Sequence, residues 1–122
     1  MSSPTARTLK YLRDEGWEAQ VVERWCQFSR RRKDLFNFID VVAIKHGRIM
    51  GVQATSGSNH AGHKAKILAE ERALGWLKAG GSIMLITWSK RKLKPGGKAV
   101  RWTPRIEMIE EGMFDATTDT DD

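Results

Sequence analysis

The fold of this chain depends on residues 38–55, which read Phe38-Ile39-Asp40-Val41-Val42-Ala43-Ile44-Lys45-His46-Gly47-Arg48-Ile49-Met50-Gly51-Val52-Gln53-Ala54-Thr55. The pattern predicts two β-strands joined by a two-residue turn at His46-Gly47, which places Asp40 directly opposite Gln53. Opposed residues have Cβ atoms about 5 Å apart. Because side chains alternate along a strand, Gln53 and Thr55 share one face. A carboxylate, an amide and a hydroxyl are therefore expected to converge on one side of this hairpin.

The segments before the hairpin predict one helix and one strand. Thr5 is a suitable cap for a helix that runs to Glu15, and Gly16 is a suitable stop. Residues Trp17 to Trp25 alternate in polarity, which favours a strand. A basic loop, residues 27–35, is expected to connect this strand to the hairpin.

The segments after the hairpin predict a helix and two strands. Ser58 or Asn59 can cap a single helix running to Ala79, because its apolar residues recur at three- and four-residue spacings. Residues 82–88 are apolar almost throughout and predict a central strand. A loop over residues 90–98 leads to a last strand over 100–109. The resulting order, α-β-β-β-α-β, predicts an α/β fold with a mixed central sheet flanked by helices.

The length of 122 residues predicts one domain, residues 1–112, followed by an acidic tail, residues 113–122, that we expect to be disordered. The sequence has no apolar run of membrane-spanning length, so we expect a cytoplasmic or other intracellular protein with no membrane partner. The single cysteine, Cys26, cannot form an internal disulfide and is expected to be a buried or half-buried filler residue. The five tryptophans are expected to pack, and Trp88 is the candidate for stacking on a base.

The net charge of +6 conceals a strong asymmetry along the chain. Residues 1–106 carry 21 basic and 8 acidic side chains, a net charge of +13, whereas the remaining residues carry seven acids. Such a basic body favours a polyanionic partner, DNA above all. The residues expected to contact phosphates are those of two dense basic runs and the histidines of the predicted second helix: Arg30, Arg31, Arg32, Lys33, His60, His63, Lys90, Arg91, Lys92 and Lys94.

The hairpin also carries a family resemblance. In the PD-(D/E)XK nuclease superfamily, an Asp within an apolar strand is followed one hairpin later by Glu or Gln, any residue and Lys; here Asp40 and Gln53-Ala54-Thr55 occupy these positions. Over about residues 5–88 the chain resembles this superfamily, particularly its Holliday-junction-resolvase-like members. The resemblance implies a restriction-endonuclease-like core, Mg²⁺ or Mn²⁺ held by Asp40, Gln53 and the Ala54 carbonyl, hydrolysis of DNA, including branched DNA, and a homodimer.

Two positions depart from the family's motif. Gln53 replaces the usual Glu and so removes one negative charge from the metal site. Thr55 replaces the usual Lys, whose ammonium group would stabilise charge on the phosphate. The resemblance implies that a lysine of the following helix, Lys64 or Lys66, takes over this catalytic role. The rotation of this helix about its axis, which the sequence does not fix, decides which of the two lysines points toward Asp40.

Two further carboxylates are candidate metal ligands. Glu23 could reach the site from the first strand, and Asp34 could reach it from the basic loop or could serve as a turn residue or a partner of Arg32. Three functions remain open at this stage. The first is a metal-dependent endonuclease, the second is an inactive nuclease fold that binds nucleic acid through its basic loops, and the third is an interaction module whose acidic tail covers the basic surface.

Overall fold

The hairpin forms two of the five strands of the central sheet. In the computed structural model, which describes residues 3–114, it consists of β4 (Val41–Lys45) and β5 (Arg48–Ser56). His46 and Gly47 have φ angles of 49° and 78°, as the predicted two-residue turn requires. The predicted register is confirmed from Lys45 opposite Arg48 to Val42 opposite Gly51.

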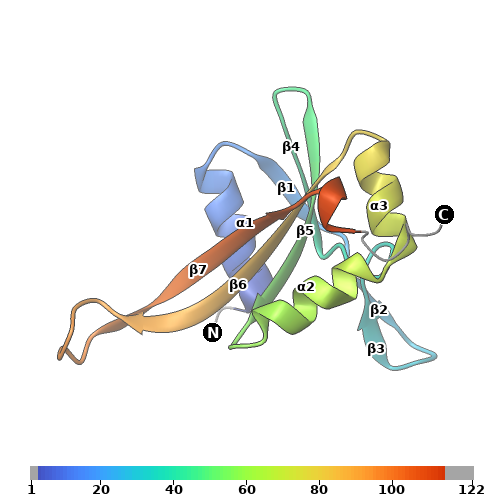
Figure 1. Ribbon diagram of the computed structural model, residues 1–122. Coiled ribbons are helices and arrows are strands. Elements are labelled where there is room, and N and C mark those ends of the chain that lie inside the picture. The colour runs from blue at the N-terminus through green and yellow to red at the C-terminus, as the bar shows by residue number, and fades with distance from the viewer. Residues whose placement is uncertain (1–2, 115–122) are drawn as a thin grey trace.

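The sheet has the strand order β1-β4-β5-β6-β7 and mixed strand directions (Figure 1). The other strands are β1 (Glu18–Val21), β6 (Ser82–Lys92) and β7 (Val100–Ile109). Only β5 and β6 are parallel, because the helical crossover between them returns the chain to its starting edge. The predicted α/β fold with a mixed sheet is confirmed.

Strand β6 is longer than predicted. Lys90, Arg91 and Lys92 pair with residues of β7, so they lie on a two-stranded ribbon that extends beyond the body of the protein (Figure 1). The loop predicted over 90–98 is correspondingly shorter. Pairing to β7 satisfies the backbone groups of these residues, and the basic side chains remain exposed.

The first helix, α1 (Pro4–Asp14), begins two residues earlier than predicted. Ser3, and not Thr5, is the cap, because its hydroxyl accepts the N–H of Ala6 at 3.1 Å and Pro4 suits the first helical position. Gly16 ends the helix as expected. It has a φ of 95°, and the N–H of Trp17 donates to the Leu12 carbonyl at 2.9 Å, as in a Schellman motif.

The single long helix expected after the hairpin is two helices, α2 (His60–Leu68) and α3 (Glu71–Lys78). Asn59 caps α2, since its side chain accepts the N–H of Gly62 at 3.2 Å. The chain is extended at Glu70, whose carboxylate accepts the N–H of Arg72 and starts a new helix. The apolar spacing alone did not reveal this capping residue.

The expected strand over Trp17 to Trp25 is interrupted. The N–H groups of Val22 and Glu23 donate to the Asp40 carbonyl at 2.9 and 3.4 Å, and there the chain leaves the sheet. It forms a separate hairpin from β2 (Arg24–Cys26) and β3 (Arg31–Lys33). Part of the predicted basic loop is therefore strand β3.

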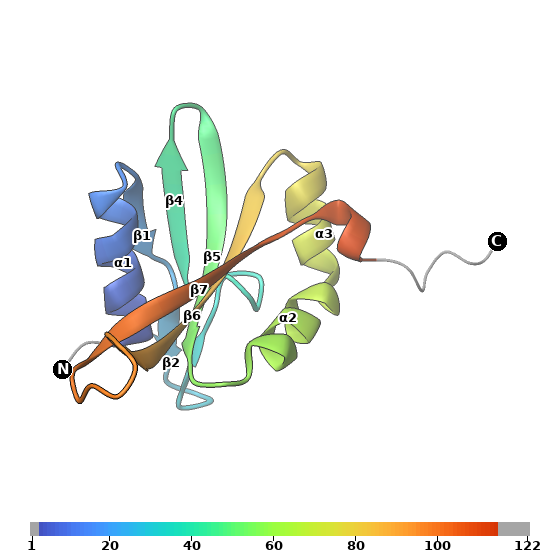
Figure 2. The same ribbon diagram turned by 60° about the vertical axis from the view of Figure 1, so that its left-hand side comes forward.

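The sheet separates two apolar cores. Helix α1 covers one face, where Leu12 and Val52 are buried, and α2 and α3 cover the other, where Ile39 and Leu85 are buried (Figure 2). Gly51 allows the second packing, because a Cβ atom there would lie 2.7 Å from the Ile39 side chain. No helix within residues 3–114 is long and apolar enough to cross a membrane.

The described residues end with a short 3-10 helix, η1 (Glu111–Met113), and with Phe114. Phe114 packs against the core under α3. The first two residues of the predicted tail are therefore ordered parts of the domain. The rest of that prediction, residues 115–122, lies outside the described residues.

Candidate metal centre

Three carboxylates meet where the β2–β3 hairpin joins the sheet. Asp40 immediately precedes β4, Glu23 immediately precedes β2, and Asp34 immediately follows β3. One carboxylate oxygen of each lies within 4.8 Å of the others. Asp40 is buried and the other two are half-buried. The structure therefore brings together the residue predicted as the principal ligand and both of the additional candidates.

Gln53 completes this group, which we call the acid cluster: Glu23, Asp34, Asp40 and Gln53. Its Nε2 donates to Asp40 Oδ2 at 3.2 Å and to Asp34 Oδ2 at 3.4 Å. The predicted proximity of Asp40 and Gln53 is confirmed. The N–H of Ala54 donates to Asp40 Oδ2 at 2.8 Å and fixes that carboxylate. The metal-ligand role expected of the Ala54 carbonyl stays a prediction.

The charges of the acid cluster are not balanced from within. Burial, a hydrogen bond shared with Asp34, and the negative charges of Asp34 and Glu23 raise the pKa of Asp40 to about 8, although the Ala54 N–H opposes this shift. Arg32 offsets one negative charge through its ion pair with Glu23 at 3.1 Å. In the absence of another cation, Asp40 therefore keeps a proton at neutral pH.

The donor atoms fit a hard divalent cation. Carboxylate and amide oxygens are the ligands that Mg²⁺ and Mn²⁺ prefer. Gln53 is 5% exposed, and its Oε1 has no hydrogen-bond partner among residues 3–114. Rotation of the terminal amide would exchange Nε2 for Oε1 and present an oxygen to the cluster. A buried acceptor without a partner is uncommon in folded proteins, and this one belongs to the side chain that adjoins Asp34 and Asp40.

A second polar group, the histidine cluster, lies on the same face of the sheet: His60, Lys64, Thr87 and Glu107. The Nε2–H of His60 donates to Glu107 at 2.9 Å, and its Nδ1 is hydrogen-bonded to the Thr87 hydroxyl at 2.8 Å. Lys64 pairs with the other oxygen of Glu107 at 2.8 Å. The Lys64 ammonium, followed by the His60 hydrogen bond, lowers the pKa of Glu107.

The histidine cluster bears on two predictions about α2, namely that His60 contacts phosphate and that Lys64 or Lys66 is catalytic. His60 is 4% exposed and both of its ring nitrogens are engaged, so its role is structural and it is not available to a phosphate. Lys64 is held by Glu107. Lys66 is exposed and lines, together with Asp34, a hollow of about 600 Å³. Of the two candidate lysines, Lys66 is therefore the one beside the acid cluster.

Thr55 does not join the acid cluster as its position on the strand suggested. Its hydroxyl is hydrogen-bonded to His63 Nε2 at 3.1 Å. Burial, followed by the nearby charges of Lys66 and His60, lowers the pKa of His63. His63 is therefore a neutral, half-buried residue at neutral pH, and it contributes no positive charge toward a phosphate.

Basic side chains line two hollows to which α2 contributes residues. Arg31, Arg32 and Lys33 line the same hollow as Lys66. A second hollow, of about 390 Å³, is lined by Lys90 and Arg91 together with other polar residues: Gly57, Ser58, His60, Thr87, Ser89 and Arg105. Lys92 and Lys94 are exposed farther along the β6–β7 ribbon, and Arg30 is exposed in the β2–β3 turn.

Two predictions about tryptophan side chains are wrong, one about stacking on a base and one about packing. Trp88 is 7% exposed and its Nε1 donates to Thr8 at 2.9 Å, so it cannot stack on a base. Trp25 is 57% exposed on β2 instead of packing. Cys26 is half-buried on the same strand, which agrees with the expectation of a buried or half-buried residue. The exposure of Trp25 follows from the hairpin leaving the sheet at Glu23.

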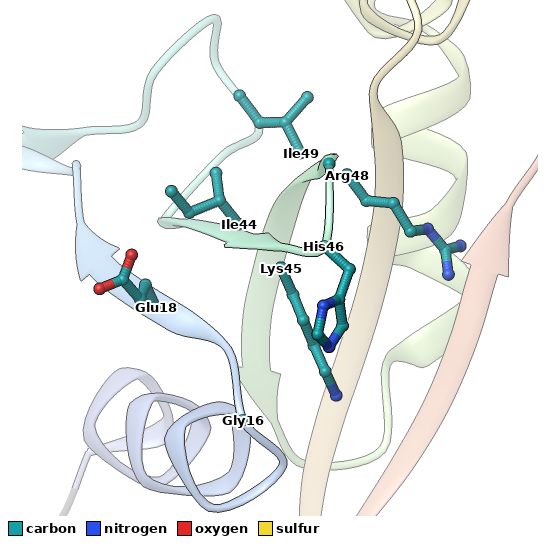
Figure 3. Close-up of a pocket in the computed structure, with 8 residues that line it drawn as sticks. Gly16, Glu18, Ile44, Lys45, His46, Arg48 and Ile49 are labelled. Carbon is teal, nitrogen blue, oxygen red and sulfur yellow. The ribbon is translucent and has the colours of Figure 1, made fainter.

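The turn of the β4–β5 hairpin forms another hollow, of about 520 Å³, shown in Figure 3. Its lining includes Glu18, Lys45 and His46 and no member of the acid cluster. Among its lining residues Glu18 is the only carboxylate, and it lies on β1 apart from Lys45 and His46 (Figure 3). The arrangement offers neither a metal-ligand set nor a paired acid and base.

Comparisons of the chain with protein-family models, curated proteins and solved structures find no match. The functional argument therefore rests on the geometry of the acid cluster and its basic surroundings.

Proposed function

We propose that the protein is a DNA endonuclease that uses Mg²⁺ or Mn²⁺, with a restriction-endonuclease-like core. The observation that carries the proposal is the acid cluster, in which three carboxylates lie within 4.8 Å beside the unpartnered amide oxygen of Gln53. The order of one helix, an antiparallel meander and a helical crossover to a parallel strand is consistent with this class. Dimerisation remains a prediction from the resemblance.

Each residue has a role that follows from its position. Asp40, Asp34 and Glu23 would hold the cation through carboxylate oxygens, and Gln53 would add its amide oxygen. The N–H of Ala54 orients Asp40. The cation, when bound, would act as a Lewis acid toward a phosphoryl oxygen and lower the pKa of a coordinated water. Lys66 would place its ammonium group beside the developing phosphate charge, the role usually given to the strand lysine.

The surroundings of the cluster suit a phosphodiester substrate. Exposed Arg31, Lys33 and Lys66 border the hollow that contains Asp34. Positive side chains beside a negatively charged metal site would bind the DNA backbone and bring a phosphate to the cation. A site for a small uncharged substrate would not require this concentration of cations.

The test is cleavage of a supercoiled plasmid and of a four-way DNA junction in Mg²⁺ or Mn²⁺. Asp40→Asn should reduce the cleavage rate by about 100-fold or more, a loss typical of removing a group that acts on transition-state charge. Glu111→Gln, which neutralises an exposed acid of η1, is the matched control and should cleave normally. Unchanged cleavage by Asp40→Asn would refute the site.

A second candidate is a nuclease fold that binds DNA without cutting it. It is favoured by the neutral side chains of Gln53 and Thr55 at positions where the family has Glu and Lys. This candidate predicts metal-independent binding whose affinity falls steeply with salt. Binding of this kind, together with no cleavage by the wild-type protein in either metal, would select it over the endonuclease.

A further inference from the structure

The β2–β3 hairpin grows directly out of the acid cluster. Glu23 precedes its first strand, Asp34 follows its second, and both are members of the cluster. Arg24 pairs with Lys33 and Cys26 with Arg31, so the two strands leave the cluster side by side. In Figure 1 the hairpin projects away from the main sheet. Whatever the cluster acts on must therefore pass next to this hairpin.

The tip of the hairpin presents an aromatic side chain that no other part of the domain covers. Phe28 is fully exposed, at 100%. It lies at the middle of a closed turn, in which the N–H of Arg30 donates to the Cys26 carbonyl at 2.8 Å. Trp25, one strand residue before the turn, is 57% exposed. Phe28 buries no surface against the domain and more than half of Trp25 is exposed, so both rings can contact a partner.

The charges of the hairpin identify the kind of partner. Its ten residues contain five cations and no acid: Arg24, Arg30, Arg31, Arg32 and Lys33. Within residues 3–114, Arg32 is the only one of these five that forms an ion pair with a carboxylate, that of Glu23. Aromatic rings interleaved with exposed cations are typical of surfaces that stack on bases while binding the phosphate backbone.

The reach of the hairpin suits a base close to the cut. Phe28 is five residues from Glu23, and a strand advances about 3.3 Å per residue, so the ring lies up to about 17 Å from the cluster. Because successive nucleotides of a strand are about 3.4 Å apart along the duplex, this distance corresponds to roughly five base steps. The ring can therefore reach a base while a nearby phosphate occupies the cluster.

We propose that the β2–β3 hairpin is a wedge that stacks Phe28 on a base at an interruption of the base stack. The preferred substrate is then DNA with a nick, a mismatch or a branch, because such a base is available without the cost of unstacking a continuous duplex. The inference rests on the proposed function, since the choice of DNA as the ligand comes from it. It adds the class of DNA and the residue that recognises it.

The test measures binding in EDTA, where no cleavage occurs. Dissociation constants are compared for a duplex with a central nick, labelled with 2-aminopurine next to the nick, and for the continuous duplex of the same sequence. Phe28→Ala should lose about tenfold in affinity for the nicked duplex and little for the continuous one. Phe28→Trp should keep the preference and the change in 2-aminopurine fluorescence. Circular dichroism establishes that each variant is folded.

Leu93→Ala is the matched control, because Leu93 is also exposed and lies at the end of the other basic ribbon. It should bind both duplexes as the wild type does. The wedge is refuted if Phe28→Ala weakens both duplexes equally or neither. It is also refuted if Phe28 is needed for binding to vesicles containing phosphatidylserine and not for binding to nicked DNA.

The outcomes separate this inference from the proposed function. If the wild type cleaves plasmid in Mn²⁺ and Phe28→Ala keeps full preference for the nicked duplex, the wedge fails and the endonuclease stands. If Phe28 is required for the preference and the wild type never cleaves, the endonuclease fails and the wedge stands as part of a DNA-binding protein.

Discussion

The acid cluster and the histidine cluster differ in how their charges are satisfied, although they lie on the same face of the same sheet. Gln53, Leu85 and Glu107 are direct neighbours across β5, β6 and β7, so the two clusters are only about 10 Å apart. Leu85 is fully buried between them. Asp40 is 4% exposed, whereas the Glu107 side chain is 27% exposed. The different chemistry of the two clusters therefore comes both from the depth of each carboxylate and from its partners.

In the histidine cluster the carboxylate has its cations within the protein. Glu107 binds both His60 and Lys64, and its pKa is lowered mainly by the Lys64 interaction. In the acid cluster, Asp40 has two carboxylate neighbours and a raised pKa. A cluster that is complete by itself contributes to stability, whereas one that lacks a cation is suited to bind one. Three variants test this distinction.

The largest effect is expected from removing the centre of the histidine cluster. His60→Ala leaves the buried Thr87 hydroxyl without its partner and creates a cavity under α2. The free energy of unfolding should fall by about 2 kcal/mol, measured by urea denaturation. His63→Ala, which loses one hydrogen bond at a half-buried position, is the control and should lose less than about 1 kcal/mol. Equal losses would mean that the two histidines contribute alike.

The next effect concerns metal affinity in the acid cluster. Gln53→Glu adds a fourth carboxylate and should tighten Mn²⁺ binding about tenfold, because more charged oxygens hold divalent ions better. Isothermal titration calorimetry measures the change. Gln20→Glu adds the same charge at an exposed position of β1 and should leave the affinity unchanged. An equal gain in both variants would indicate a general effect of net charge.

The smallest effect is the pH dependence of stability. The pKa of Asp40 in the folded protein is about 8, above its ordinary value of 3.8. Its contribution to stability is therefore complete below pH 3.8 and is lost as the pH rises through 8. Asp40→Asn should remove this loss and, at pH 9 without metal, be more stable than the wild type by about 1 kcal/mol or more.

Saturating Mn²⁺ should make the wild type more stable than Asp40→Asn at pH 9, the reverse of the order expected without metal. It would stabilise the wild type by binding the folded state and leave Asp40→Asn unaffected. Thermal unfolding followed by circular dichroism, with and without the metal, measures both differences. A wild type that is more stable than Asp40→Asn at pH 9 in EDTA would contradict the raised pKa.

The half of the acid cluster built on the hairpin was predictable from sequence. Alternation along β4 and β5 and a turn at His46-Gly47 fix the hydrogen-bond register, and the register places Asp40 beside Gln53. These are interactions between residues close in the chain. Glu23 and Asp34 were predicted only as candidate metal ligands, because their place in the cluster depends on the chain leaving the sheet after Val21.

The role of each residue in α2 was decided only by tertiary structure. The sequence offered Lys64 and Lys66 with equal justification, and helical spacing alone does not fix the rotation of a helix about its axis. Burial of Ile67 on the sheet sets that rotation. It directs Lys64 to Glu107 and leaves Lys66 beside Asp34.

The sequence by itself determined the central hairpin, the mixed α/β sheet and the basic character of the body, because these follow from local register, periodicity and composition. Tertiary structure alone brought Glu23 and Asp34 to Asp40, buried His60 and Trp88, and exposed Phe28. The physical reason is that each of these outcomes depends on where a separate hairpin or helix packs. Such packing is set by contacts between residues far apart in the chain.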